Sequence, residues 1–220
     1  VTQTADAFTI DRWKSRTNQS SKFSVQRVLP ATDTLHYAAK ITSLAATSPG
    51  ANDYYQFQQG IEGNNFNRAR FGYATAKTLT LSFYVRSSLT GTFSVILSNY
   101  TGNRCLPLTY TISSANTWER KVLTIPGDTS GTWERGTTAG LFIYFTLGYG
   151  SSNDGSASAS WTGTFIRGVT GSVNVVATNG ADWQVTGVQL ELGSEATEFE
   201  HRDFNDELTY CQRYFYRYRT

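Results

Sequence analysis

The stretch TLTLSFYVRSSLTGTFSVILSN, residues 78–99, alternates apolar and polar side chains in two successive runs. In the first run one face carries Leu79, Leu81, Phe83 and Val85, and in the second run it carries Phe93, Val95 and Leu97. A period of two is typical of a β-strand with one buried side. The link SLTG between the runs is short enough for a hairpin, so this part of the chain is predicted to be an antiparallel meander.

The same alternation recurs along the rest of the chain. Further strands are predicted at residues 7–13, 22–28, 36–43, 53–62, 118–125 and 140–148. The run GLFIYFTLG at 140–148 is apolar on both faces, which predicts a central strand that is covered on each side. About ten or eleven strands in all predict an all-β, two-sheet sandwich of antiparallel strands.

Residues 172–193 contain a turn signal and a break in phase. Asn179-Gly180 tolerates the positive φ angles of a tight turn, so a hairpin is predicted there. Trp183 and Val185 have one parity, whereas Val188, Leu190 and Leu192 have the other. An extra residue near Thr186-Gly187 would return the later apolar side chains to the core, which predicts a β-bulge.

The C-terminal stretch NDELTYCQRYFYRYRT mixes aromatic and basic residues, and two interpretations compete for it. One is a nucleic-acid hook; the other is a short helix packed on the sandwich, over about residues 203–216. Asp203 or Asn205 can cap such a helix, and Arg213 and Arg217 complement its dipole. Leu208, Cys211 and Phe215 form one apolar stripe at helical spacing. We therefore expect a docked helix.

Composition excludes several classes of protein. The chain has 220 residues, of which 39% are hydrophobic, and its net charge of +2 is too small to indicate a polyanion partner. We therefore expect no nucleic-acid partner. The sequence has no run of about 18 apolar residues, so membrane insertion is not expected. The chain starts at Val1 and contains no methionine. We expect one domain over residues 1–220, as the distal part of a longer chain.

Motifs for catalysis are missing from the sequence. His36 and His201 are the two histidines, and neither has metal-ligand spacing. The two cysteines, Cys105 and Cys211, are expected to be free and partly buried thiols. Four acids, Glu191, Glu195, Glu198 and Glu200, could suggest a paired-carboxylate glycosidase. They lie in one local stretch, however, and a solvated strand end is the better interpretation. The chain is expected not to be an enzyme.

Aromatic residues in turns and polar segments suggest a different chemistry. Five candidates for glycan contact lie in or beside segments rich in Gly, Asn and Ser: Tyr54, Tyr100, Trp133, Tyr149 and Trp161. A flat ring can cover the C–H face of a sugar, and neighbouring polar groups can bind its hydroxyls. The alternative for each ring is core packing, which we expect for Trp13, Trp118 and Trp183. No cofactor is expected, although lectin-like sandwiches often bind structural Ca²⁺; Asp11 and Glu191 are the candidate ligands.

The C-terminal segment QLELGSEATEFEHRDFNDELTYCQRYFYR, residues 189–217, resembles the closing segment of many bacteriophage tail-fibre and related virion proteins. DRW at 11–13, QGIEG at 59–63, LTLSFYVRSSLTGTFSV at 79–95 and TWERKVLTIPGDTSGTW at 117–133 resemble the same family in the same order. The resemblance covers nearly the full chain. It implies a jelly-roll β-sandwich similar to carbohydrate-binding modules, carried on a larger, trimeric fibre or spike.

These expectations combine into two functional hypotheses. The first is a non-enzymatic receptor-binding domain at the tip of a phage tail fibre or spike, a homotrimer that binds a host cell-surface glycan during host adhesion. The second is a structural decoration or adaptor protein that contacts other virion proteins. The accessory binding domain of a depolymerase is a third hypothesis. In each case the protein would be made in the host cytoplasm and located in the virion, on the phage tail or particle surface.

Overall fold

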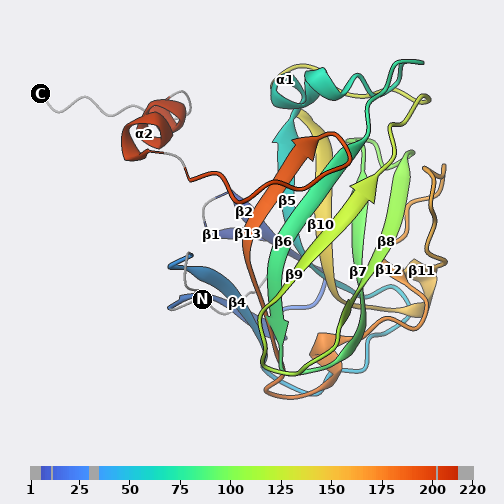
Figure 1. Ribbon diagram of the computed structural model, residues 1–220. Coiled ribbons are helices and arrows are strands. Elements are labelled where there is room, and N and C mark those ends of the chain that lie inside the picture. Colours follow the sequence, from blue (N-terminus) through green and yellow to red (C-terminus); the bar gives the residue numbers. More distant parts are fainter. Residues whose placement is uncertain (1–5, 11, 30–34, 202, 213–220) are drawn as a thin grey trace, which may run out of the picture.

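The computed structural model describes residues 6–10, 12–29, 35–201 and 203–212. Within them two antiparallel sheets pack face to face (Figure 1). The six-stranded sheet has, in spatial order, β1 (Ala7–Ile10), β2 (Trp13–Thr17), β5 (Tyr54–Glu62), β10 (Ala139–Tyr149), β7 (Gly91–Ser98) and β8 (Cys105–Ile112). The five-stranded sheet has β3 (Phe23–Val28), β4 (Ala38–Ser43), β13 (Asp182–Leu192), β6 (Leu79–Ser87) and β9 (Glu119–Ile125). The expected all-β sandwich is confirmed.

The order of the strands is that of a jelly roll. If β4 to β10 and β13 are numbered one to eight along the chain, the two sheets contain them in the orders 1-8-3-6 and 2-7-4-5. This is the arrangement of two interlocked Greek keys. Strands β1, β2 and β3 extend the same edge of the sandwich, and β11 (Asp154–Gly155) pairs with β12 (Gly168–Val169) in a separate two-stranded ladder.

Four aromatic rings join the two sheets at the centre of the core. Phe57 and Phe145 come from the six-stranded sheet, and Phe83 and Trp183 come from the five-stranded sheet. The ring centroids of Phe83 and Phe145 lie 5.0 Å apart, and those of Phe145 and Trp183 lie 5.1 Å apart. The Trp183 Nε1–H donates to the Tyr110 hydroxyl at 3.0 Å, so the buried indole nitrogen is satisfied.

Two connections differ from the sequence expectation. The link SLTG does not form a hairpin, because β6 lies in one sheet and β7 in the other. Alternation tells which face of a strand is buried, and it does not tell which strand is the neighbour. Asn179-Gly180 does form a turn, but β13 pairs with β4 and β6, and residues 175–177 form the 3₁₀ helix η3 (Val175–Ala177). The predicted hairpin is therefore wrong.

Two other details of the strands agree with the sequence. The register of β13 against β6 shifts between Thr186 and Gln189, and Gly187 has a φ of +57°. The predicted β-bulge at Thr186-Gly187 is thus confirmed. Strand β10 lies between β5 and β7 and is buried on both faces, as predicted for a central strand.

The C-terminal helix forms over part of the predicted range, and its docking stays a prediction. Helix α2 (Phe204–Gln212) lies within the predicted range, and Figure 1 shows it beside the sandwich rather than over a sheet. Leu208 and Cys211, two members of the predicted stripe, are exposed, and so is Tyr210. Phe215, Arg213 and Arg217 lie outside the described residues. Among the described helices none is long and apolar enough to cross a bilayer.

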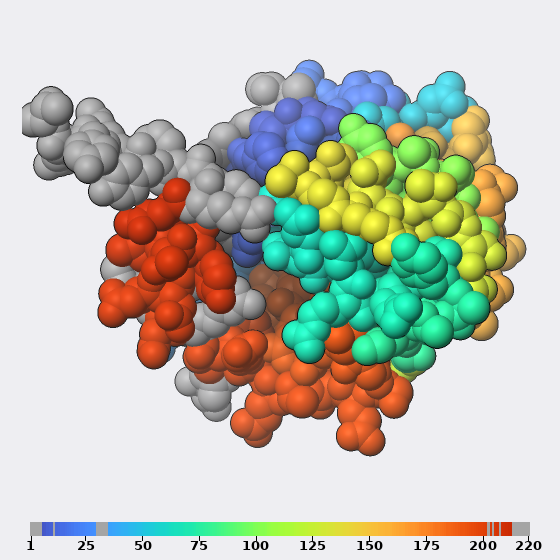
Figure 2. All heavy atoms as spheres, turned by 90° about the horizontal axis from the view of Figure 1, so that it is seen from above, coloured from blue at the N-terminus to red at the C-terminus, as the bar shows by residue number. Residues whose placement is uncertain are grey.

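Short helices close one end of the sandwich. Helix α1 (Gly63–Phe66) is followed by η1 (Asn67–Ala69), and hydrogen bonds from Gly63 N to Thr138 O and from Asn64 N to Gly136 O join this turn to the segment before β10. Figure 2 shows the two segments side by side at this end. After β10, η2 (Ser151–Asn153) begins a long connecting segment that continues to residue 173 and includes β11 and β12.

We predict that Phe145→Ala lowers the free energy of unfolding by about 3–5 kcal/mol, because it leaves a cavity between three other aromatic rings. Urea denaturation followed by tryptophan fluorescence measures the change. Val122→Ala is the matched control, since this β9 side chain is exposed; we expect an effect below about 0.5–1 kcal/mol. Equal losses for the two variants would contradict the assignment of the core.

A second prediction concerns alkaline pH. Burial and, to a smaller extent, the charge of Asp53 raise the pKa of Tyr55 to about 12. The folded protein therefore holds this phenol proton to higher pH than the unfolded chain does. The stability contribution of Tyr55 is fully present below pH ~10, the ordinary tyrosine pKa, and is lost as the pH rises through the folded value.

We expect the free energy of unfolding to fall as the pH rises above 10, and we expect Tyr55→Phe to reduce that fall. Denaturant titrations at a series of alkaline pH values measure it. Some decline should remain, because burial also raises the pKa values of Tyr110 and Tyr144. An unchanged slope in Tyr55→Phe would be evidence against a buried, protonated Tyr55.

Candidate functional site

The outer face of the six-stranded sheet carries two rows of polar side chains. Pairing aligns Arg16, Gln56 and Thr146 across β2, β5 and β10, and it aligns Lys14, Gln58 and Tyr144 one row along. Their neighbours Tyr55, Phe57 and Phe145 point into the core. Gln56 and Gln58 are themselves buried, so other groups must cover them.

The long connecting segment between β10 and η3 covers part of these side chains. The carbonyl oxygen of Arg167 accepts hydrogen bonds from Gln56 Nε2 at 3.2 Å and from Thr146 Oγ1 at 2.6 Å. The Arg167 side chain returns the contact, since Nη1 donates to Gln56 Oε1 at 3.2 Å. Further along, the Tyr149 hydroxyl donates to Val169 O. These bonds hold residues 165–169 against β5 and β10.

Aromatic rings continue from this segment across the sheet. The ring centroids are 5.6 Å apart for Phe165 and Tyr144, 5.8 Å for Tyr144 and Phe142, and 6.3 Å for Phe142 and Tyr100. Tyr144 is buried beneath the others, Phe142 and Phe165 are half-buried, and Tyr100 is 55% exposed. Solvent therefore reaches a strip of rings that rests on Tyr144.

Cationic side chains gather at the β2 and β5 side of this strip. The guanidinium carbon of Arg167 lies 3.9 Å from the centroid of the Tyr54 ring and 5.2 Å from that of Phe165. Arg16 Nη1 donates to Gln58 Oε1 at 3.1 Å, and Arg16 Nε lies 2.6 Å from Asp6 Oδ2. Lys14 Nζ lies 3.8 Å from the same carboxylate oxygen.

The sheet-face site consists of these exposed or half-buried groups: Lys14, Arg16, Tyr54, Tyr100, Phe142, Phe165 and Arg167. It combines flat apolar rings with hydrogen-bond donors on the sheet and on the loops that pack against it. Such a combination can bind a ligand that has both an apolar face and polar substituents. Burial lowers the pKa of Arg167, and the nearby charge of Arg16 acts in the same direction.

Of the five aromatic residues predicted to contact glycan, three are in the interior. Trp133, Trp161 and Tyr149 are 4%, 9% and 8% exposed. The Trp133 and Trp161 rings meet edge to face at 5.0 Å, and their Nε1–H groups donate to Ser130 O and Pro126 O. The loops that carry Trp133 and Trp161 fold back on the sandwich and Tyr149 ends β10, so little of each ring is accessible. Tyr54 and Tyr100 lie on the sheet-face site.

The remaining site residues were not predicted from the sequence. Phe142 and Thr146 lie on the same face of β10 as Tyr144. The sequence predicts that this face is covered, because the strand is apolar on both sides. Lys14 and Arg16 alternate with buried Ser15 and Thr17 in β2. That alternation was the available signal for a basic outward face. The position of Arg167 depends on how the connecting segment between β10 and η3 folds, and no sequence pattern indicates it.

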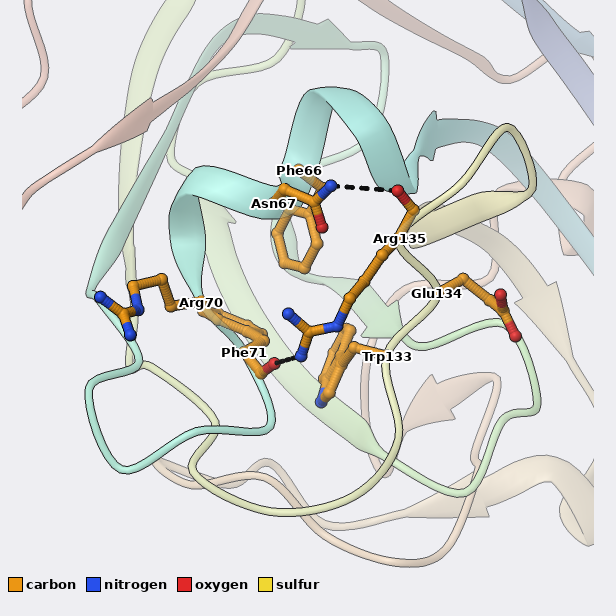
Figure 3. Close-up of a pocket in the computed structure, with 7 residues that line it drawn as sticks. All are labelled: Phe66, Asn67, Arg70, Phe71, Trp133, Glu134 and Arg135. Atoms are coloured by element: carbon orange, nitrogen blue, oxygen red, sulfur yellow. Dashed lines mark hydrogen bonds between the residues drawn. The ribbon is translucent and has the colours of Figure 1, made fainter.

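A small hollow lies at the α1 end, where Trp133 and Phe71 form the floor (Figure 3). Its cavity volume is about 10 Å³, room for roughly one water molecule. Asn67 Nδ2 donates to Arg135 O at 3.0 Å, and Arg135 Nη2 donates to Phe71 O at 3.2 Å. These bonds close the hollow, which is too small for a sugar.

The other sequence candidates are placed as follows. Glu191 accepts hydrogen bonds from the Thr197 hydroxyl and backbone N–H, and Asp11 lies outside the described residues, so the Ca²⁺ expectation stays a prediction. Within the described ranges no three His, Cys, Asp or Glu side chains cluster as metal ligands. Glu195, Glu198 and Glu200 are exposed, as expected for a solvated strand end. Cys105 is buried and Cys211 is exposed.

Tryptophans expected to pack do so. Trp183 is fully buried, Trp13 is half-buried and stacks on Phe57 with centroids 4.8 Å apart, and half-buried Trp118 packs against a small cluster around Leu35. The partial burial of Trp13 and Trp118 reflects their places beside β1 and β9, where the sandwich ends.

Comparison with known proteins gives similarity of fold at low sequence identity. No family model and no curated protein matches the chain. The tailspike protein 4 enzymatically active domain of bacteriophage CBA120 is 13% identical over 84% of this chain, with a TM-score of 0.46. This chain spans only 20% of the tailspike domain's length.

Isolated carbohydrate-binding modules are similar over most of their own length. The family 11 module of a Clostridium thermocellum cellulosomal cellulase is 13% identical, and the alignment covers 89% of this chain and 97% of the module, with a TM-score of 0.45. A CBM4 structure is 14% identical, with 82% and 87% covered and a TM-score of 0.42.

We predict that Trp161→Ala lowers the free energy of unfolding by about 3–5 kcal/mol, because the ring packs on Phe71 and Trp133 in the closed end of the core. Thermal and urea denaturation test this. Tyr100→Ala serves as the contrast, since most of that ring is in solvent, and it should change stability by less than about 1 kcal/mol. A stable Trp161→Ala protein would show that Trp161 is not a core residue.

Proposed function

We propose that this chain binds a polysaccharide across the sheet-face site. The observation that carries the proposal is the strip of accessible rings, Tyr100, Phe142 and Phe165, supported by buried Tyr144 on a rigid sheet. The C–H faces of successive sugars would cover these rings, and Arg16, Lys14 and Arg167 would bind sugar oxygens. Phe142 and Tyr144 are on a strand, and the segment that carries Phe165 and Arg167 is bonded to the sheet through the Arg167 carbonyl, so this part of the site needs little reordering when the ligand binds.

The chain would act as a binding domain rather than an enzyme. A glycosidase needs a carboxylic acid with a raised pKa to protonate the leaving group. The pKa of Glu191 is instead lowered: partial burial opposes this, but hydrogen bonds from Gln189 and Thr197 outweigh it. Glu191 is therefore ionised at neutral pH and is poorly suited to the role of general acid.

In its biological setting, the domain would form the distal part of a phage tail fibre or spike, as the sequence resemblance suggests. The polysaccharide would then be a host cell-surface glycan that is bound during adsorption, and the protein would be located in the virion. A homotrimeric fibre would present three sheet-face sites together. Once one site has bound, the other two would be held near the same surface at a high effective concentration, so weak individual binding would add up to a high overall affinity.

Binding to extracted bacterial surface polysaccharides, measured by affinity electrophoresis and calorimetry, tests the proposal. We expect Tyr100→Ala and Phe142→Ala each to weaken binding by about tenfold or more, which corresponds to roughly 1.4 kcal/mol. Tyr73→Ala is the matched control, since Tyr73 is also exposed and contacts an arginine, yet lies in the loop between η1 and β6 and is not one of the sheet-face residues.

The fold of every variant is checked by circular dichroism before binding is compared. Folded site variants that bind as well as the parent, or a loss equal to that of Tyr73→Ala, would exclude the sheet face as the binding surface.

A second function, as a decoration or adaptor protein of the virion, is favoured by other exposed apolar side chains. Phe8 in β1 is 74% exposed but pairs with Lys14 of the sheet-face site, whereas Leu29 follows β3 of the five-stranded sheet and is 64% exposed. Leu208 and Tyr210 of α2 are exposed as well. Such apolar side chains suit contacts with other subunits. Substitution of Leu29 and Leu208 by serine would then disrupt assembly and leave polysaccharide binding unchanged.

A further inference from the structure

Two arginines lie next to each other in the sheet-face site. Arg16 Nη1 binds Gln58 Oε1, and Arg167 Nη1 binds Gln56 Oε1. Gln56 and Gln58 are alternate residues of β5, so they point to the same face with their Cα atoms about 6.6–7 Å apart. Two guanidinium groups that come from separate parts of the chain are thereby held side by side above one strand.

Negative charge does not balance this cluster among the residues that the structure describes. Lys14 and Arg16 share the carboxylate of Asp6, and Arg167 forms no ion pair with any residue that the structure describes. Burial and, to a smaller extent, the neighbouring charge of Arg16 lower the pKa of Arg167, so the two guanidinium groups are close enough to repel each other. An anion between them would relieve this repulsion.

An arginine with a purely structural role looks different in the same protein. Arg104 binds both carboxylate oxygens of Asp128, through Nε at 2.6 Å and Nη2 at 2.8 Å, and this pair raises its pKa. Arg104, which holds parts of the fold together, is thus paired with a carboxylate of the same chain. Arg167 instead has one neutral acceptor, Gln56 Oε1, and two aromatic faces, and its Nε and Nη2 have no hydrogen-bond partner among the described residues.

We propose that the sheet-face site is specific for acidic polysaccharides, with a sugar carboxylate bound between Arg16 and Arg167 and adjoining sugar rings on Phe142 and Tyr100. This inference rests on the proposed function and names its ligand class. A planar guanidinium fork matches a carboxylate in a bidentate manner, and the rings beside it match the apolar face of a sugar. A sulfate or phosphate ester shares the same anionic chemistry.

The layout of the charges favours an acidic glycan over single-stranded nucleic acid. A nucleic-acid groove places cations along the whole backbone and stacks bases beside them. Here Lys14, Arg16 and Arg167 gather at one side of the strip, whereas the Phe142–Tyr100 pair lies at the other side. The site therefore fits one anionic group followed by an uncharged surface.

Paired ligands test the proposal on the whole 220-residue chain. The acidic set is polygalacturonate, alginate, hyaluronate and polysialic acid; the neutral set is carboxyl-reduced polygalacturonate, galactan and dextran; dextran sulfate and poly(dT) complete the panel. Affinity is measured by calorimetry in low and high NaCl. We expect at least one carboxylated polymer to bind about tenfold or more tightly than every neutral one, and that preference to shrink as salt rises.

Arginine variants locate the preference. We expect Arg167→Gln and Arg16→Gln to lose most of it, and Arg167→Lys to retain part because a charge remains without the fork. The Arg167 carbonyl that anchors the segment is unchanged by these substitutions. Arg86→Gln is the matched control: Arg86 lies on the five-stranded sheet and donates to the backbone and side chain of Asn116.

The outcomes separate the two levels of the proposal. Binding of neutral polymers only, or an acidic preference that Arg16→Gln and Arg167→Gln both keep, would overturn acidic specificity and leave polysaccharide binding in place. Binding of no polysaccharide would overturn both. Tighter binding of dextran sulfate than of every carboxylated polymer would assign the site to sulfate esters and refute the proposal that it binds a sugar carboxylate. Tightest binding of poly(dT) would refute glycan recognition in favour of nucleic acid.

Discussion

The pairing of β13 with both β4 and β6 closes the five-stranded sheet, and the rest of the sandwich depends on it. Trp183 aligns with Ile41 on one side and with Ser87 on the other, so three segments far apart in the chain meet at this residue. The same indole reaches across the core to Phe57 and Phe145 and binds the Tyr110 hydroxyl. The six-stranded sheet is held in place through these contacts, and with it the outer face that carries the site.

Much of the secondary structure could be predicted from the sequence because burial on one face leaves a period of two. This accounts for the strands, for the bulge at Thr186-Gly187 and for the central position of β10. The partner of each strand could not be predicted in the same way. Residues 88–91 are as short as a hairpin loop, yet they cross from one sheet to the other, because β6 and β7 each find a better neighbour elsewhere: β9 and β13 for β6, and β8 and β10 for β7.

The candidate site was predicted only in part, because the sequence does not show whether a loop turns toward the core or toward solvent. Tryptophan in a loop rich in Gly and Ser suggests an exposed ligand contact, but the loops around Trp133 and Trp161 turn inward and close one end of the core. Of the accessible rings, Phe142 is on strand β10, where local sequence does not separate an outward aromatic side chain from a buried one, and Phe165 is in a loop whose position depends on the fold. Tyr54 and Tyr100 were identified because they lie at strand ends, where turn residues mark the surface.

The attachment of residues 165–169 separates the position of this segment from the identity of its side chains. Gln56 and Thr146 bind the carbonyl oxygen of residue 167, which every amino acid possesses, while the side chain at that position faces the ligand surface. Evolution can therefore exchange the side chain without moving the segment. Within a family of such domains, this position would be a natural place for ligand preference to diverge while the scaffold stays constant.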